Sequence, residues 1–80
     1  MTPEELRQIL ATGLPGSEVT VTGDGRHFDA RVVSDAFEGL SVIRQHRLVY
    51  EILGDRFDRD VVHALSIKTY TPAQWRALNG

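Results

Sequence analysis

Three histidines are the residues of this sequence that offer the most chemistry: His27, His46 and His63. His27 follows a Gly-Asp-Gly turn, and His63 lies in an apolar segment, on the same alternating face as Leu65 and Ile67. A neutral imidazole suits iron or zinc as a ligand, and a histidine also serves as a proton carrier or a hydrogen-bonded structural residue. We interpret His46, in the middle of a predicted helix face, as a packing residue.

Two of these histidines, His27 and His63, stand near the start of predicted strands. If both strands begin at the same end of one sheet, the two imidazoles would meet at one rim. Taken alone, each has a simpler explanation: His27 is a solvated loop residue and His63 a hydrogen-bonded histidine at the edge of the core. Two imidazoles also make an incomplete metal site, so other groups would have to supply the remaining ligands. The spacing permits convergence and does not establish it.

Capping and turn signals predict the elements that would position these side chains. Thr2-Pro3-Glu4-Glu5 is typical of a helix start, and the same Thr-Pro device recurs at Thr71. Alternating β-branched residues and a Gly-Asp-Gly turn predict a hairpin. The expected elements are a helix ended by Gly13, strands 18–23 and 27–33, a connection 34–39 with one helical turn, a helix from Ser41 to about Leu53, a strand 61–70 and a last short helix carrying Trp75 and Leu78.

This order predicts an α+β fold in one domain over residues 1–80: a three-stranded sheet with helices packed on one face, in the order helix-strand-strand-helix-strand-helix. In the second strand, Phe28, Ala30 and Val32 share one face, and Asp29 and Arg31 share the other. On the wheel of the central helix, Arg44, Arg47 and Glu51 fall opposite an apolar face centred on Val42, His46, Val49 and Leu53.

The composition limits the possible functions. The chain has 80 residues, no cysteine and a formal net charge of −2. Without thiols it can form no disulfide and cannot by itself hold a thiolate zinc site or an iron–sulfur cluster. We expect a cytoplasmic location, because cysteine is absent and the acidic start lacks the features of a signal peptide. We expect no membrane span, since no apolar run approaches the required length of about 18 residues.

Enzyme motifs are missing from the sequence. It contains no cysteine nucleophile, no Gly-x-Ser-x-Gly elbow, no Walker loop and no His-Glu-x-x-His helix. Gly23-Asp24-Gly25 lies between two strands instead of opening a helix, so it is a turn and not a phosphate loop. The carboxylates of Asp29 and Asp35 have no evident catalytic partner. We therefore predict a protein that binds a partner and is not an enzyme.

Several short blocks in order resemble the BolA family, from about residue 4 to residue 76. They are residues 23–28 (Gly-Asp-Gly-Arg-His-Phe), 32–34 (Val-Val-Ser), 37–39 (Phe-Glu-Gly), 45–50 (Gln-His-Arg-Leu-Val-Tyr), 62–66 (Val-His-Ala-Leu-Ser) and 68–72 (Lys-Thr-Tyr-Thr-Pro), followed by Trp75. The first block is most similar to the BolA-like branch called IbaG or YrbA. The family often has Arg-His-Arg where this chain has Gln45-His46-Arg47, so no role of the first arginine is carried over.

The resemblance implies a fold related to the type II KH domain and partnership with monothiol glutaredoxins in iron–sulfur trafficking or iron and stress regulation. It implies that His63 is a ligand of a bridging [2Fe-2S] cluster and that His27, in the hairpin loop, is the second ligand. The glutaredoxin cysteine and glutathione would supply the thiolates, so the isolated chain would bind no cluster. Histidine ligation of one iron has a precedent in Rieske centres.

Two alternatives remain open. Some family members are described as transcriptional regulators, and Arg31, Arg44, Arg47 and Lys68 could contact DNA. Against this, Gly39-Leu40-Ser41-Val42 lacks the second glycine of a KH clamp, and the acidic chain offers little attraction to phosphates. The other alternative is an adapter that binds glutaredoxin without a cluster. The adapter should tolerate substitution of both histidines, whereas a cluster partner should not.

Overall fold

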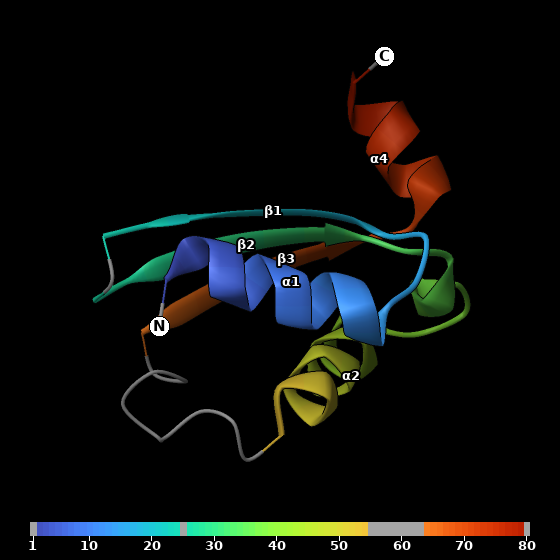
Figure 1. Cartoon of the computed structure of the whole chain (residues 1–80). Coiled ribbons are helices and arrows are strands. Elements are labelled where there is room, and N and C mark those ends of the chain that lie inside the picture. Colours follow the sequence, from blue (N-terminus) through green and yellow to red (C-terminus); the bar gives the residue numbers. More distant parts are fainter. Residues whose placement is uncertain (1, 25, 55–63, 80) are drawn as a thin grey trace.

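A mixed three-stranded sheet forms the centre of the molecule (Figure 1). The structure, a computed structural model, describes residues 2–24, 26–54 and 64–79. Strand order is β1-β2-β3, with β1 antiparallel to β2 and β2 parallel to β3. The elements are α1 (Pro3–Gly13), β1 (Glu18–Gly23), β2 (Phe28–Val33), a 3-10 turn η1 (Asp35–Phe37), α2 (Val42–Leu53), β3 (Leu65–Tyr70) and α4 (Pro72–Asn79).

The predicted caps are confirmed at the helix starts. The Thr2 hydroxyl accepts the backbone N–H of Glu5 at 3.1 Å, and the Ser41 hydroxyl accepts that of Arg44 at 3.3 Å. At the last helix, the Gln74 N–H donates to the Thr71 hydroxyl at 3.1 Å, while the Thr71 N–H donates to the Gln74 side chain at 2.9 Å. These bonds satisfy N–H groups that have no partner inside a helix, so local sequence alone determines where each helix begins.

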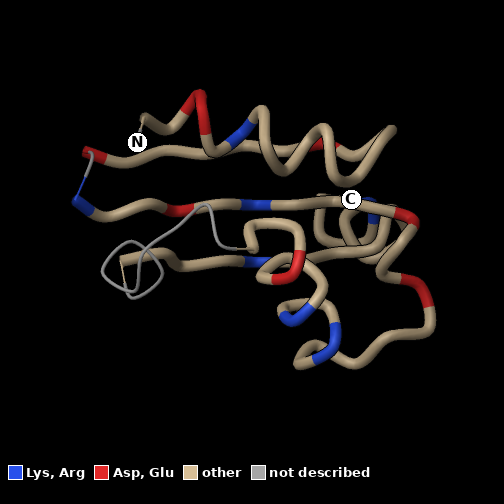
Figure 2. The backbone as a smooth tube through the Cα atoms, turned by 60° about the horizontal axis from the view of Figure 1, so that its bottom comes forward, with Lys and Arg blue, Asp and Glu red and all other residues tan. Residues whose placement is uncertain are grey.

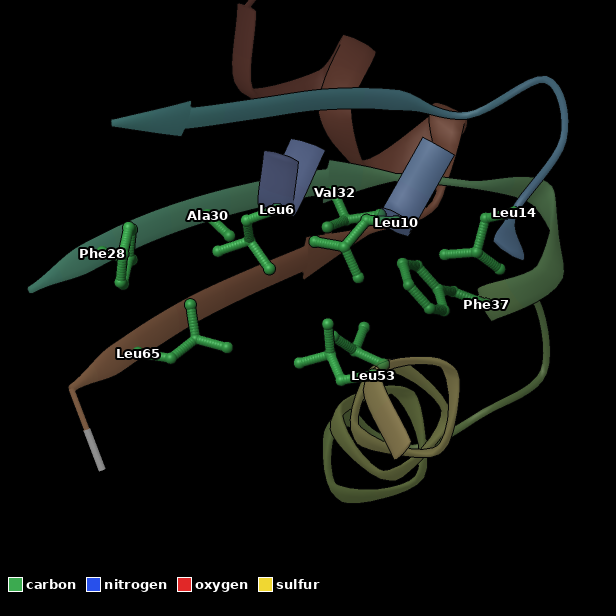
Figure 3. Packing of buried hydrophobic residues seen from close by; sticks show 10 residues of the cluster. Leu6, Leu10, Leu14, Phe28, Ala30, Val32, Phe37, Leu53 and Leu65 are labelled. Carbon is green, nitrogen blue, oxygen red and sulfur yellow. The ribbon is translucent and has the colours of Figure 1, made fainter. Parts of the chain in front are cut away.

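One face of the sheet is covered, and the core lies there. In Figure 1, α1 and α2 lie on the same side of the strands and α4 extends on the other side. Leu6 and Leu10 of α1 are fully buried against the sheet, and Phe28 and Val32 face them from β2 (Figure 3). The predicted α+β fold is confirmed, as is the division of β2 into an apolar and a polar face. Full burial of each such side chain contributes about 1.5–3 kcal/mol. The expectation that the helices pack on one face is wrong for α4, whose Trp75 contacts Arg31 on the other face.

The predicted face of α2 is wrong in one respect. Val42, placed at the centre of the apolar face, is 62% exposed, whereas Gln45 is 2% exposed. The Gln45 amide donates to the Leu40 carbonyl at 3.0 Å, and its oxygen accepts the Thr69 hydroxyl at 2.6 Å. Because these bonds satisfy the amide, Gln45 joins Val49 in the buried stripe, and the helix turns its first residues outward.

The third strand also differs from the prediction. Its described part begins at Leu65, and Ala64 lies in a turn. The predicted beginning of this strand, residues 61–63, lies outside the described residues.

Candidate functional site

The turn between β1 and β2 fixes the backbone at His27. The Asp24 carboxylate accepts the N–H groups of Arg26 at 2.8 Å and of His27 at 2.9 Å. These two bonds hold the pKa of Asp24 below its usual range, since each favours the charged form. The Asp24 N–H also donates to the His27 carbonyl at 3.3 Å. The turn thus binds both backbone groups of His27.

Gly23 allows this turn to close. A Cβ atom added at Gly23 would collide with the His27 carbonyl oxygen, which is backbone and cannot rotate away. The His27 side chain is exposed. The Asp24 carboxylate and one main-chain hydrogen bond close the turn, with Gly23 leaving room for it, and the turn presents the His27 side chain to solvent.

Parallel pairing brings the neighbours of the two candidate ligands together. Phe28 lies opposite Leu65, and the Phe28 N–H donates to the Ala64 carbonyl at 2.9 Å. Phe28 directly follows His27, and Ala64 directly follows His63. His63 itself lies outside the described residues. The described residues therefore show that β2 and β3 begin at the same end of the sheet. The two histidines could meet at one rim only if this were so.

The third histidine lies elsewhere. His46 is half-buried on α2 and lines a shallow hollow with Val42 and Ile67. In the described residues, no group of three or more histidines, cysteines or carboxylates is arranged to hold a metal ion. The carboxylates of Asp29 and Asp35 are both exposed.

The four cations of the nucleic-acid alternative fall into two pairs. Arg31 of β2 and Lys68 of β3 are opposite each other on the uncovered face of the sheet. Arg44 and Arg47 are exposed on α2, which covers the other face, and they line a hollow together with Glu51. Figure 2 shows basic residues on the strands and on α2 as separate groups. The structure does not join the four into one basic surface.

Sequence reasoning missed two features of this region. Asp24 appeared only as a turn residue, yet its carboxylate holds the loop, and the Asp-x-x-His spacing offered a signal for this. Gln45 gave no signal on a hydrophobic wheel, because an amide scores as polar wherever it lies. In the parts of the chain described here, no helix is long and apolar enough to cross a membrane.

The fold and the site define a class: a small α+β domain with a mixed sheet, whose hairpin presents a histidine at the end where β2 and β3 begin. A family model described as BolA-like protein matches residues 11–74. Acid stress protein IbaG of Escherichia coli (strain K12) is 40% identical over 83 residues, covering 100% of this chain and 99% of its own. The chain belongs to the BolA family.

Solved structures agree with this assignment. A bolA protein homologue from Coxiella burnetii superposes with a TM-score of 0.83 at 44% identity, covering 95% of this chain and 97% of its own. The BolA domain of SufE1 from Arabidopsis thaliana superposes with a TM-score of 0.75 at 37% identity, covering 89% and 92%. The predicted family and its IbaG-like branch are confirmed.

Proposed function

We propose that this protein is a BolA-type partner of a monothiol glutaredoxin and shares a bridging [2Fe-2S] cluster with it in the cytoplasm. His27 and His63 are the proposed ligands from this chain, and the glutaredoxin cysteine and glutathione supply the thiolates. The protein acts by binding and not by catalysis. The observation that carries the proposal is the hydrogen bond between Phe28 and Ala64, the residues that directly follow the two histidines.

The donor chemistry of the described part fits this role. His27 is exposed, so its ring is accessible to a second protein, and its backbone is held by Asp24. A ligand whose main chain is already fixed loses less conformational entropy when it binds. The chain has no cysteine, so a cluster ligated here needs thiolates from outside. When bound, the cluster would supply the redox-active iron, and His27 and His63 would be its ligands from this chain.

Two similar proteins have names consistent with a role of this kind. One carries its BolA domain within SufE1, and the other is called an acid stress protein. DNA binding receives less support, because the four candidate cations are divided between two sides of the sheet.

The test is anaerobic reconstitution of the cluster with a monothiol glutaredoxin, glutathione, iron and sulfide, followed by visible circular dichroism with and without this protein. We expect a spectrum distinct from that of the glutaredoxin homodimer. His63→Ala should abolish it and His27→Ala should weaken or shift it. His46→Ala is the matched control, since it removes an imidazole from α2, and should leave the spectrum unchanged.

Binding of the apo-proteins, measured by calorimetry, separates the adapter from the cluster partner. If both histidine variants bind glutaredoxin as before and the visible spectrum never differs from that of the homodimer, the cluster proposal is wrong and the adapter is favoured. A coordinating imidazole must be neutral, so we also expect the shared spectrum to fade as the pH is lowered.

A further inference from the structure

The sheet face that α1 and α2 leave open carries three cross-strand rows of residues, and one of them, Val33, is buried. The middle row contains two cations, and each outer row contains a carboxylate. In order, the rows are Thr22–Asp29–Ser66, Thr20–Arg31–Lys68 and Glu18–Val33–Tyr70. Trp75 of α4 adjoins the middle and last rows. The first two rows, with Tyr70 and Trp75, line a hollow of about 440 Å³, and Glu18 and Val33 lie outside its lining. A hollow of this size is within the range of small-molecule sites, about 300–1,000 Å³.

The two cations of the middle row are an unusual pair. Arg31 and Lys68 are directly opposite each other on neighbouring strands, which are about 4.8 Å apart in any sheet. Like charges on residues directly opposite each other in a sheet are unfavourable. Neither side chain forms an ion pair with another described residue, since the described salt bridge joins Arg7 to Glu4. An anion that contacts both Arg31 and Lys68 would therefore offset the unfavourable pairing of two like charges.

Arg31 is held in place for such a contact. Its Nη2 donates to the Thr20 hydroxyl at 3.1 Å, and its Cζ lies 4.3 Å from the centre of the Trp75 ring. The Trp75 ring in turn packs at 49° against Tyr70, with ring centres 5.2 Å apart. A guanidinium that is stacked and hydrogen-bonded loses little freedom on binding and still has N–H groups to donate.

We propose that this open face binds a phosphate monoester that carries a planar ring, with a nucleoside 5′-monophosphate as the representative ligand. A phosphate monoester carries a charge of about −1.5 to −2 at pH 7, which matches the two cations. The hydroxyls of Thr20 and Ser66 offer further hydrogen bonds to its oxygens. Tyr70 and Trp75 also line the hollow, so the planar ring would meet aromatic side chains beside the phosphate.

The outer rows select a compact anion over a polyanion. Glu18 and Asp29 are on either side of the cation row along the strands. A single phosphate centred on Arg31 and Lys68 faces one carboxylate, that of Asp29, which lines the same hollow, whereas Glu18 lies outside its lining. A nucleic-acid strand running along β2 would bring further phosphates against both carboxylates, and like charges repel. This site uses no histidine, so it stands or falls independently of the proposed cluster.

The test uses the whole chain and its one tryptophan, Trp75. AMP, adenosine and inorganic phosphate are each titrated while Trp75 fluorescence and the amide NMR spectrum are followed. We expect saturable binding of AMP below about 10 mM, with shifts centred on Thr20, Arg31 and Lys68. Phosphate should bind more weakly at the same residues, and adenosine at least about tenfold more weakly, because it lacks the charge.

Substitutions in the cation row then test the assignment. Arg31→Gln and Lys68→Gln should each weaken AMP binding about tenfold, since each removes a charge-assisted contact. Arg44→Gln, a matched change on α2, should have no effect. Asp29→Asn should tighten AMP binding and allow a short oligothymidylate to bind.

The proposal is overturned if AMP does not saturate, if its shifts centre on α2, or if Lys68→Gln and Arg44→Gln have equal effects. It is also overturned if the oligothymidylate binds the unaltered chain more tightly than AMP does. The amide spectra of the variants show at the same time that each one is folded.

Discussion

The two faces of the sheet differ in how far their side chains are buried. On the covered face, Phe28 and Val32 of β2 are buried with Leu6 and Leu10 of α1. On the open face, Asp29 and Arg31 of the same strand are exposed. One strand therefore supplies the core with Phe28, Ala30 and Val32 and leaves Asp29 and Arg31 between them to solvent. The difference predicts that substitutions on the covered face change stability more than substitutions on the open face do.

The largest effect is expected on the covered face. Phe28→Ala should lower the free energy of unfolding by about 3–5 kcal/mol, because it removes a buried ring and leaves a cavity. Urea denaturation followed by far-ultraviolet circular dichroism measures this. Thr22→Ala on the open face is the control and should change little. A loss below about 1 kcal/mol for Phe28→Ala would mean that the core is not where the packing places it.

A smaller effect is expected at the buried amide. Gln45→Ala should cost about 1–3 kcal/mol, since it leaves the Thr69 hydroxyl and the Leu40 carbonyl without their partner. Urea denaturation gives the free energy of unfolding of Gln45→Ala, of Thr69→Val and of the double variant, which together with the unaltered protein form a double-mutant cycle. The double variant should cost less than the sum of the two. Additive costs would show that the Gln45–Thr69 bond contributes nothing.

On the open face the expected effect on stability is small. Arg31→Gln should cost no more than about 1 kcal/mol, the worth of an exposed cation–π contact. Thermal unfolding of Arg31→Gln measures this cost. Thr20→Val, which removes the hydroxyl that accepts the Arg31 hydrogen bond, is measured for comparison. A cost as large as that of Gln45→Ala would contradict the separation of the two faces.

The smallest effect is expected at the hairpin turn in acid. The pKa of Asp24 is lowered in the folded chain by the N–H groups of His27 and Arg26. Its contribution is therefore present above the unfolded value, about 3.9 for aspartate, and is lost as pH falls through the lower folded value. The amide signals of Arg26 and His27 should shift with a midpoint below about 3.9, and Asp24→Asn should abolish the titration. A midpoint at or above that value would contradict the two bonds.

Much of the fold follows from local signals. The starts of α1, α2 and α4 lie where a hydroxyl side chain can accept a free N–H, and this needs only residues three positions apart. The hairpin follows from its turn, where Gly23 lies so close to the His27 carbonyl oxygen that a residue with a Cβ atom would collide with it. The alternation in β2 was likewise readable, because side chains of a strand point to opposite faces in turn.

The sequence by itself determined which residues are candidates: the three histidines, the cations of β2, α2 and β3, and the absence of thiols. Tertiary structure alone decided which of them come together. Parallel pairing placed Phe28 against Ala64 and Arg31 against Lys68, residues 36 or 37 positions apart. The packing of α2 against the sheet likewise decided that Gln45 is buried and Val42 is exposed. The physical reason is that a cap or a turn is closed by neighbours in the chain, whereas strand pairing and burial depend on surfaces that meet only after folding.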